Sequence, residues 1–154
     1  MSSLETFKAL KYMLIICSIL RAEVLVLQTP PSLKFTEENI TAIKQTLLYL
    51  KQGGITIAWE VRSSLGKKIP LELYELMEEL DIIPVVDLSK FDPPPRELIY
   101  GRIFGGLKPM TKSELQAIYK RVNKSIARKV YVCFHGARMY RDAETFSTLV
   151  NYER

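Results

Sequence analysis

The chain has 154 residues, of which 47% are hydrophobic and 25% are charged. That length fits one domain with a sizeable core, and that composition excludes a disordered chain. The net charge of +5 favours anionic partners only weakly, and two cysteines are too few for a small disulfide-stapled protein.

The first expected element is a helix over Glu5–Leu20, because apolar residues recur at spacings of three and four. Its segment Tyr12–Leu20 is strongly apolar but far shorter than a membrane span, and Arg21 follows it without a signal-peptide cleavage site. The segment therefore predicts a buried helix, no membrane partner and a cytoplasmic location. Cys17 and Cys133 lie in apolar runs and are expected to be buried thiols.

Five short apolar runs then predict strands, typical of a parallel sheet buried on both faces. The expected strands are Val24–Leu27, Ile55–Val61, Ile82–Val86, Leu98–Ile103 and Val130–Phe134. Helices are expected from Thr36 to the glycines at 53–54, from Pro70 to about Leu80, over Thr111–Ile126 and over Asp142–Val150. The prolines at 93–95 leave no room for a helix between the third and fourth strands, so a structured loop is expected there.

A polar residue stands at or just after the end of each run. These residues are Gln28, Glu60 with Arg62, Asp87, Arg102 and His135. Parallel strands share one direction, so their C-terminal ends line up along the edge where α/β folds bind ligands. We therefore expect these six side chains to converge at one site.

Glu60 and Arg62 are two residues apart, so on one strand their side chains point to the same face. Two roles are open for this pair. The residues form a structural ion pair, or Arg62 binds an anionic group while Glu60 acts as a base. Arg102 is followed by Gly105 and Gly106, and a glycine pair after a strand lets backbone N–H groups approach a phosphate.

Asp87 has three possible roles, as an acid or base, as a metal ligand, or as the partner of an arginine. His135 is the only histidine, and it suits either general acid–base work or hydrogen-bonded scaffolding. One histidine and a few carboxylates provide too few of the usual ligands for a catalytic zinc site. No metal site is therefore predicted, and no cofactor is identified. No GxSxG, Walker or GxGxxG motif is present, which argues against serine hydrolases, P-loop enzymes and dinucleotide oxidoreductases.

The basic residues are densest on and just after the fourth expected helix. They are Lys120, Arg121, Lys124, Arg128 and Lys129. This cluster is either a solvated helix face or a footprint for a phosphate backbone.

The ordered motifs QTPPS, WEVRSS, VVD, YGRIFGG, VYVCFHG and YRDAETF resemble the second half of the YecE-like family, the domain of unknown function number 72. The resemblance covers about residues 22–150 and implies a partial (β/α) TIM-type barrel, with about five parallel strands and flanking helices and no established activity. Phe104 stands where many members have His, and His135-Gly136 stands where many have Asn-Asn.

The resemblance also implies that residues 1–154 form a single domain lacking about three βα units of a full barrel. Three functions follow as hypotheses, with enzyme activity left open. The first is binding or processing of an anionic, phosphate-containing ligand at the strand ends, with Glu60, Asp87 and His135 as catalytic candidates. The second is a basic nucleic-acid-binding protein. The third is a remnant or subunit that completes its sheet as a homo-oligomer or with a partner chain.

Overall fold

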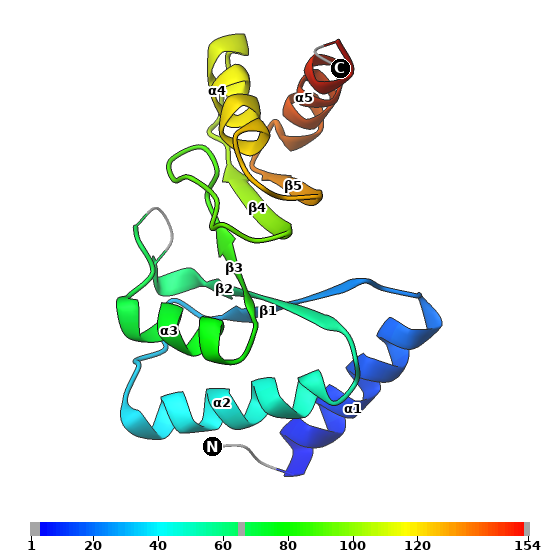
Figure 1. Cartoon of the computed structure of the whole chain (residues 1–154), viewed down its shortest axis with the longest axis vertical. Coiled ribbons are helices and arrows are strands. Elements are labelled where there is room, and N and C mark those ends of the chain that lie inside the picture. Colours follow the sequence, from blue (N-terminus) through cyan, green and yellow to red (C-terminus); the bar gives the residue numbers. More distant parts are fainter. Residues whose placement is uncertain (1–3, 65–66, 153–154) are drawn as a thin grey trace. The chain divides into compact units, whose positions relative to one another are not determined.

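The computed structural model describes residues 4–64 and 67–152. Within them lie five strands, which pair in parallel in the order β1-β2-β3-β4-β5 (Figure 1). The strands are β1 (Val24–Thr29), β2 (Thr56–Val61), β3 (Ile83–Val86), β4 (Leu98–Phe104) and β5 (Lys129–His135). The helices are α1 (Leu4–Ile19), α2 (Glu37–Lys51), α3 (Leu71–Glu79), α4 (Lys112–Asn123) and α5 (Met139–Tyr152). This arrangement is an α/β fold of the partial (β/α) barrel type, which confirms the predicted fold class.

The chain divides into two compact units, and the boundary between Pro84 and Val85 lies inside β3. In the first unit, β1 pairs with β2 along its whole length, and β2 pairs with the first half of β3. In the second unit, the last two residues of β3 pair with β4, and β4 pairs with β5 along its whole length.

The core of the first unit forms where α2 and α3 lie along one side of β1 and β2 (Figure 1). Trp59 is fully buried in this core, makes an edge contact with Phe35, and donates its indole N–H to Thr29 Oγ1 at 3.2 Å. Helix α2 begins where the sequence predicts, because Thr36 Oγ1 accepts a hydrogen bond from the backbone N–H of Asn39.

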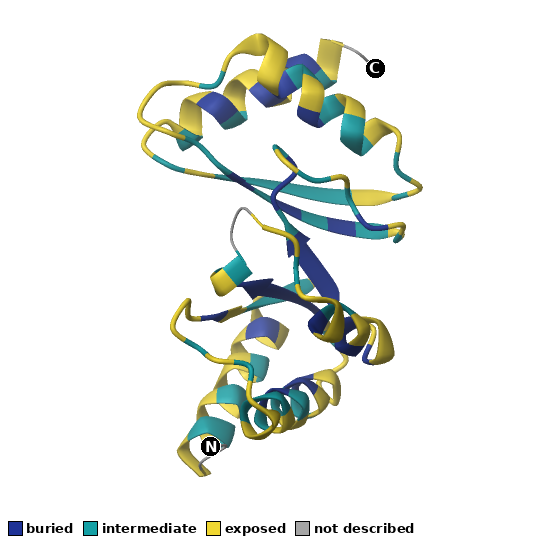
Figure 2. Ribbon diagram, turned by 90° about the vertical axis from the view of Figure 1, so that its left-hand side faces the viewer, coloured by how far each residue is buried: buried dark blue, intermediate teal, exposed yellow. Residues whose placement is uncertain are grey.

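The core of the second unit lies between the β4–β5 pair and the helices α4 and α5, which cover one face of these strands (Figure 2). Ile99 and Ile103 of β4 point into this core together with Leu115 and Ile118 of α4. The segment 87–97, which contains the prolines, connects β3 to β4 without a helix, as the sequence predicts.

Burial on both faces is confirmed for β2 but is wrong for β1, β4 and β5. In β4 the residues alternate strictly between buried and half-buried, and the inner residues of β5 are all half-buried. Tyr100, Phe104, Tyr131 and Cys133 count as apolar in a sequence pattern, yet they lie on the strand face opposite the helices, whereas Phe134 packs against Phe146 of α5.

The prediction that Tyr12–Leu20 is a buried helix is also wrong. The segment is helical through Ile19, but Cys17 is the one buried residue of α1, while Ile19 is 75% exposed. The expectation for cysteines holds for Cys17, whereas Cys133 is only half-buried. Among the described residues, no helix combines the length and the apolar character that a membrane crossing requires.

Two local boundaries differ from expectation. Pro70 is the N-cap of α3 rather than a residue of its first turn. Strand β2 ends at Val61, and Arg62 begins a short 3-10 turn, Arg62–Ser64. The premise that Glu60 and Arg62 share one strand face is therefore wrong.

Candidate functional site

In the first unit, the ends of β1 and β2 bring Gln28 and Glu60 together. The two residues are directly opposite each other in the parallel register, and Gln28 Nε2 donates to Glu60 Oε2 at 3.2 Å. The Glu60 side chain is only 2% exposed, so this charge depends on polar neighbours. Gln28 is exposed at the end of β1, and its amide is engaged with the buried carboxylate.

Arg62 also lies near Glu60, but it reaches the carboxylate from the turn after β2 and not from within the strand. The 3-10 turn after β2 folds the side chain back, and Arg62 Nε lies 3.5 Å from Glu60 Oε1. The Arg62 side chain is 37% exposed. This geometry supports the structural ion-pair interpretation, because the guanidinium offsets the cost of the buried carboxylate.

In the second unit, the ends of β4 and β5 bring Arg102 and His135 together. Arg102 Nη2 lies 3.4 Å from His135 Nδ1, although the two residues are 33 positions apart. Phe104 lies directly opposite His135 in the register, and the rings meet edge to face at 5.7 Å between centroids. The Arg102 guanidinium lies over the Phe104 ring at 5.4 Å from its centroid. A guanidinium, an imidazole and an aromatic ring therefore form one cluster, which we call the strand-end cluster.

The same strand face continues towards the beginning of β4 and β5 with aromatic and polar side chains. Tyr100 lies against Tyr131 with 5.8 Å between ring centroids, and the thiol of Cys133 is 3.2 Å from the Tyr100 hydroxyl. The opposite face holds the buried Ile99 and Ile103. The tyrosines are not among the site residues predicted from the sequence, although their alternation with isoleucine and valine is the signal that places them on the face with Arg102.

Asp87 lies just beyond β3 and is held by its immediate neighbours. Its Oδ1 accepts hydrogen bonds from the Ser89 backbone N–H at 3.1 Å and the Ser89 hydroxyl at 2.6 Å. Its Oδ2 lies 3.5 Å from Lys90 Nζ. The ion-pair partner of this carboxylate is thus a lysine three residues on and not an arginine.

The glycines after β4 have different environments. The Gly105 N–H already donates to His135 O at 2.8 Å, and a Cβ on Gly105 would lie 3.3 Å from Asp142 Oδ2. Gly106 is exposed, and a Cβ added to it would have open space within 4 Å in the described part of the chain. The amide of Gly105 is therefore used inside the protein, and Gly106 remains the glycine with an open approach.

Asp142 is a buried carboxylate that is not among the site residues predicted from the sequence. It belongs to the first turn of α5, is 1% exposed, and accepts a hydrogen bond from the Met110 N–H at 2.9 Å. It thereby ties the loop after β4 to the start of α5. The signal available in the sequence was an acidic residue in the first turn of an expected helix, a favourable position for a negative charge.

The structure thus brings the predicted residues together in three groups. These are Gln28 with Glu60 and Arg62, Arg102 with His135, and Asp87 with its own turn. The convergence of all six remains a prediction. Within residues 4–64 and 67–152, no cluster of three or more histidine, cysteine, aspartate or glutamate side chains could hold a metal ion.

Comparisons with known proteins identify the fold. No family model matches the sequence, and no curated protein matches it. The structure is similar to the crystal structure of a DUF72 family protein from Enterococcus faecalis V583, with a TM-score of 0.73 and 18% sequence identity. The match covers 98% of this chain and 70% of that chain. The resemblance predicted from the strand-end motifs is therefore confirmed at the level of the fold.

Proposed function

We propose that the second unit binds a phosphate-bearing anion at the strand-end cluster. The observation that carries this proposal is the 3.4 Å approach of Arg102 to His135. Two side chains that donate hydrogen bonds are placed at the C-terminal ends of neighbouring parallel strands, the edge that α/β folds use for ligands. Arginine suits phosphate because its planar fork presents paired donors.

Phe104 supports this role by fixing the arginine. A guanidinium that lies over an aromatic ring is attracted to the ring face and loses freedom before the ligand arrives. The edge contact of Phe104 with His135 restrains the imidazole in the same way. Binding then costs less side-chain entropy than it would for two unrestrained side chains.

The position of the imidazole defines how it would contact the anion. In the tautomer with its proton on Nε2, Nδ1 accepts a hydrogen bond from Arg102, and Nε2–H is left to donate to a ligand. Asp142 places a negative charge beside Gly105, so the anion is expected on the Arg102 side of the cluster and away from that glycine.

A binding titration with adenosine 5′-monophosphate at low salt tests the proposal. The wild-type chain should bind, and Arg102→Ala should weaken binding by about tenfold or more, because one charge-assisted contact is worth roughly 1.5–3 kcal/mol. Arg138→Ala is the control, since this exposed arginine belongs to the same unit but not to the cluster. Binding of the nucleotide by Arg102→Ala with the same affinity and the same stoichiometry as the wild type would refute the proposal.

A second candidate function is self-association through α1. Tyr12, Ile15, Ile16 and Ile19 are all exposed on this helix, by 68%, 45%, 47% and 75%. We propose a second copy of the chain as the partner, because a two-fold axis sets one apolar face against the same face of the other copy. The pairing is expected to be antiparallel, since that arrangement keeps Lys8 and Lys11 of the two copies at opposite ends.

A further inference from the structure

A groove on the second unit lies away from the strand-end cluster. It has a volume of about 580 Å³ and runs between the proline loop and the C-terminal part of α4. Its lining combines the prolines at 93–95 with Lys120, Arg121, Lys124 and Ile126. Small-ligand sites usually have volumes of about 300–1,000 Å³, so the groove is large enough for more than an isolated ion.

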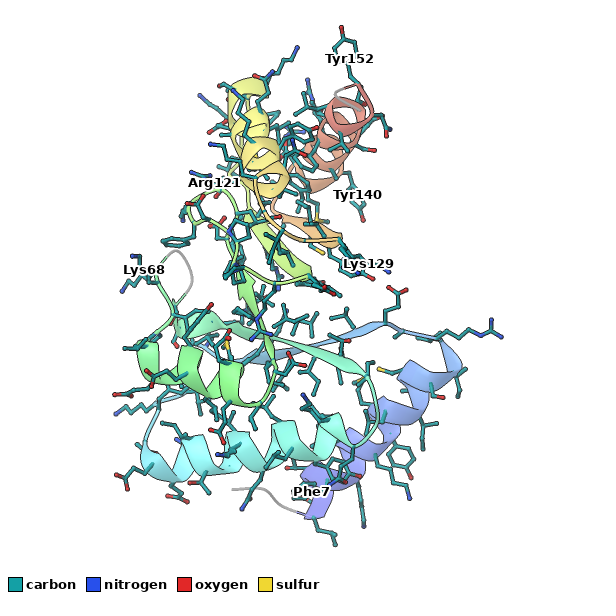
Figure 3. The ribbon with its side chains drawn as sticks, in the orientation of Figure 1. Phe7, Lys68, Arg121, Lys129, Tyr140 and Tyr152 are labelled. Atoms are coloured by element: carbon teal, nitrogen blue, oxygen red, sulfur yellow. The ribbon has the colours of Figure 1, made fainter. Side chains whose placement is uncertain are left out.

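Arg121 holds the two walls of the groove together. Its Nη1 donates to Leu88 O at 3.0 Å and to Ser89 O at 2.8 Å, and its Nε lies 3.4 Å from Asp92 Oδ1. Figure 3 shows Arg121 on α4 next to the loop that precedes β4. The prolines fix their own backbone angles and add to this rigidity. The groove is therefore formed before any ligand binds.

The charge of the groove comes from Lys120 and Lys124. They are four residues apart at the end of α4, so their side chains are neighbours on one side of the helix. In the described part of the chain neither lysine forms an ion pair, whereas Arg121 has Asp92 as its partner. Two ammonium groups thus remain available, and the lining carries an excess of positive charge.

The opposite wall holds the rigid Pro93, Pro94 and Pro95, which have no N–H donors, together with Asp92, whose carboxylate is engaged with Arg121. Ile126, which follows α4 and is 67% exposed, adds apolar surface to the lining. This combination of apolar proline surface and a pair of ammonium groups matches a ligand that carries a phosphate at one end and a flat ring at the other.

We propose that this groove is a second binding site, for a nucleotide-sized ligand whose phosphate contacts Lys120 and Lys124 and whose ring contacts the prolines. The lysines also have a structural effect, because positive charges near a helix C-terminus interact favourably with the helix dipole. A binding measurement separates the two roles, since the dipole effect changes stability and does not require a ligand.

The test uses Arg102→Ala as the background, so that the strand-end cluster does not contribute. Adenosine 5′-monophosphate, adenosine and inorganic phosphate are titrated by calorimetry at low salt. The nucleotide should bind at least about tenfold more tightly than either fragment, because only it contacts both walls. The double substitution Lys120→Gln with Lys124→Gln keeps the apolar stems and should weaken nucleotide binding by about tenfold or more.

The control is Lys8→Gln with Lys11→Gln, which removes the same charge from an exposed helix face of the first unit. These substitutions should leave nucleotide binding unchanged. Equal loss in both double variants would show a general charge effect and overturn the site. Three further results would overturn the site as well. They are undiminished binding after Lys120→Gln with Lys124→Gln, equal affinities for the nucleotide and adenosine, and no nucleotide binding at millimolar concentration. Nucleotide binding at the strand-end cluster is measured separately. For this measurement the Lys120→Gln, Lys124→Gln chain is compared with the same chain carrying Arg102→Ala.

Discussion

Gly101 of β4 lies directly against the buried side chain of Leu88, and a Cβ on Gly101 would be 2.1 Å from Leu88 Cδ1. The missing side chain at this position lets the leucine pack on the strand. Gly101→Ala should therefore lower the free energy of unfolding by about 1–3 kcal/mol, because the leucine must shift.

Chemical denaturation of a double-mutant cycle checks this relationship. In the Leu88→Ala background, Gly101→Ala should cost much less than it does in the wild type, because the clashing atoms are gone. Gly106→Ala is the control and should change stability by less than about 0.5 kcal/mol, because its new Cβ would meet open space in the described part of the chain. A Gly101→Ala chain as stable as the wild type would contradict the packing described.

Asp142 should contribute strongly to the stability of the second unit. Asp142→Ala removes the acceptor of the Met110 N–H and should cost about 1.5–3 kcal/mol, the typical value for a hydrogen bond to a charged group. Urea unfolding measures the change. Glu144→Ala, on an exposed position of the same helix, should have little effect. Similar losses for the two variants would show that the buried hydrogen bond is unimportant.

The start of α4 should be sensitive to acid. The Thr111 hydroxyl and the Thr111 backbone N–H donate to the Glu114 carboxylate and hold its pKa below the ordinary value of 4.5. A lowered pKa means that the carboxylate stabilises the folded state above pH 4.5, and that this contribution is lost as the pH falls through the lowered pKa. Thermal unfolding of wild type and Glu114→Gln should therefore differ at neutral pH and converge in acid. A difference that grows on acidification would contradict this sign.

The exposed face of α1 should control the oligomeric state. Ile15→Glu with Ile19→Glu places charges on that face and should convert an associated form into a monomer. Light scattering at high micromolar concentration gives the mass directly. Lys8→Glu with Glu5→Lys is the control, because it changes charges on the same helix and leaves the apolar residues in place. A wild-type chain that is monomeric at that concentration would rule out the association.

Much of the fold follows from local rules that the sequence displays. Thr36 supplies a side-chain acceptor for a helix start, and the prolines at 93–95 prevent a helix between β3 and β4. These outcomes depend on a residue and its near neighbours, so the sequence predicts them well. Apolar periodicity also predicts that α1 is helical, but it says nothing of whether a partner surface covers the helix. The exposure of Ile19 therefore could not be predicted.

The place of Arg102 and His135 at strand ends was predictable, but their pairing was not. Arg102 and His135 both stand at strand ends, which the sequence shows. Their contact depends on the register that sets Phe104 opposite His135, and no local signal in either strand specifies that alignment. Arg62 shows the opposite case. Its approach to Glu60 was expected, but a turn beyond the strand achieves it in place of the strand geometry assumed.

The most direct test of the proposed phosphate site follows the imidazole signals of His135 by NMR during a titration with adenosine 5′-monophosphate at low salt. Because His135 is the only histidine, its ring protons identify it without ambiguity. The proposal predicts a saturable shift of these signals in the wild type and in Lys120→Gln, Lys124→Gln, and a much weaker response in Arg102→Ala. Ring signals that stay unchanged while the ligand reaches saturating concentration would contradict an anion site at Arg102 and His135.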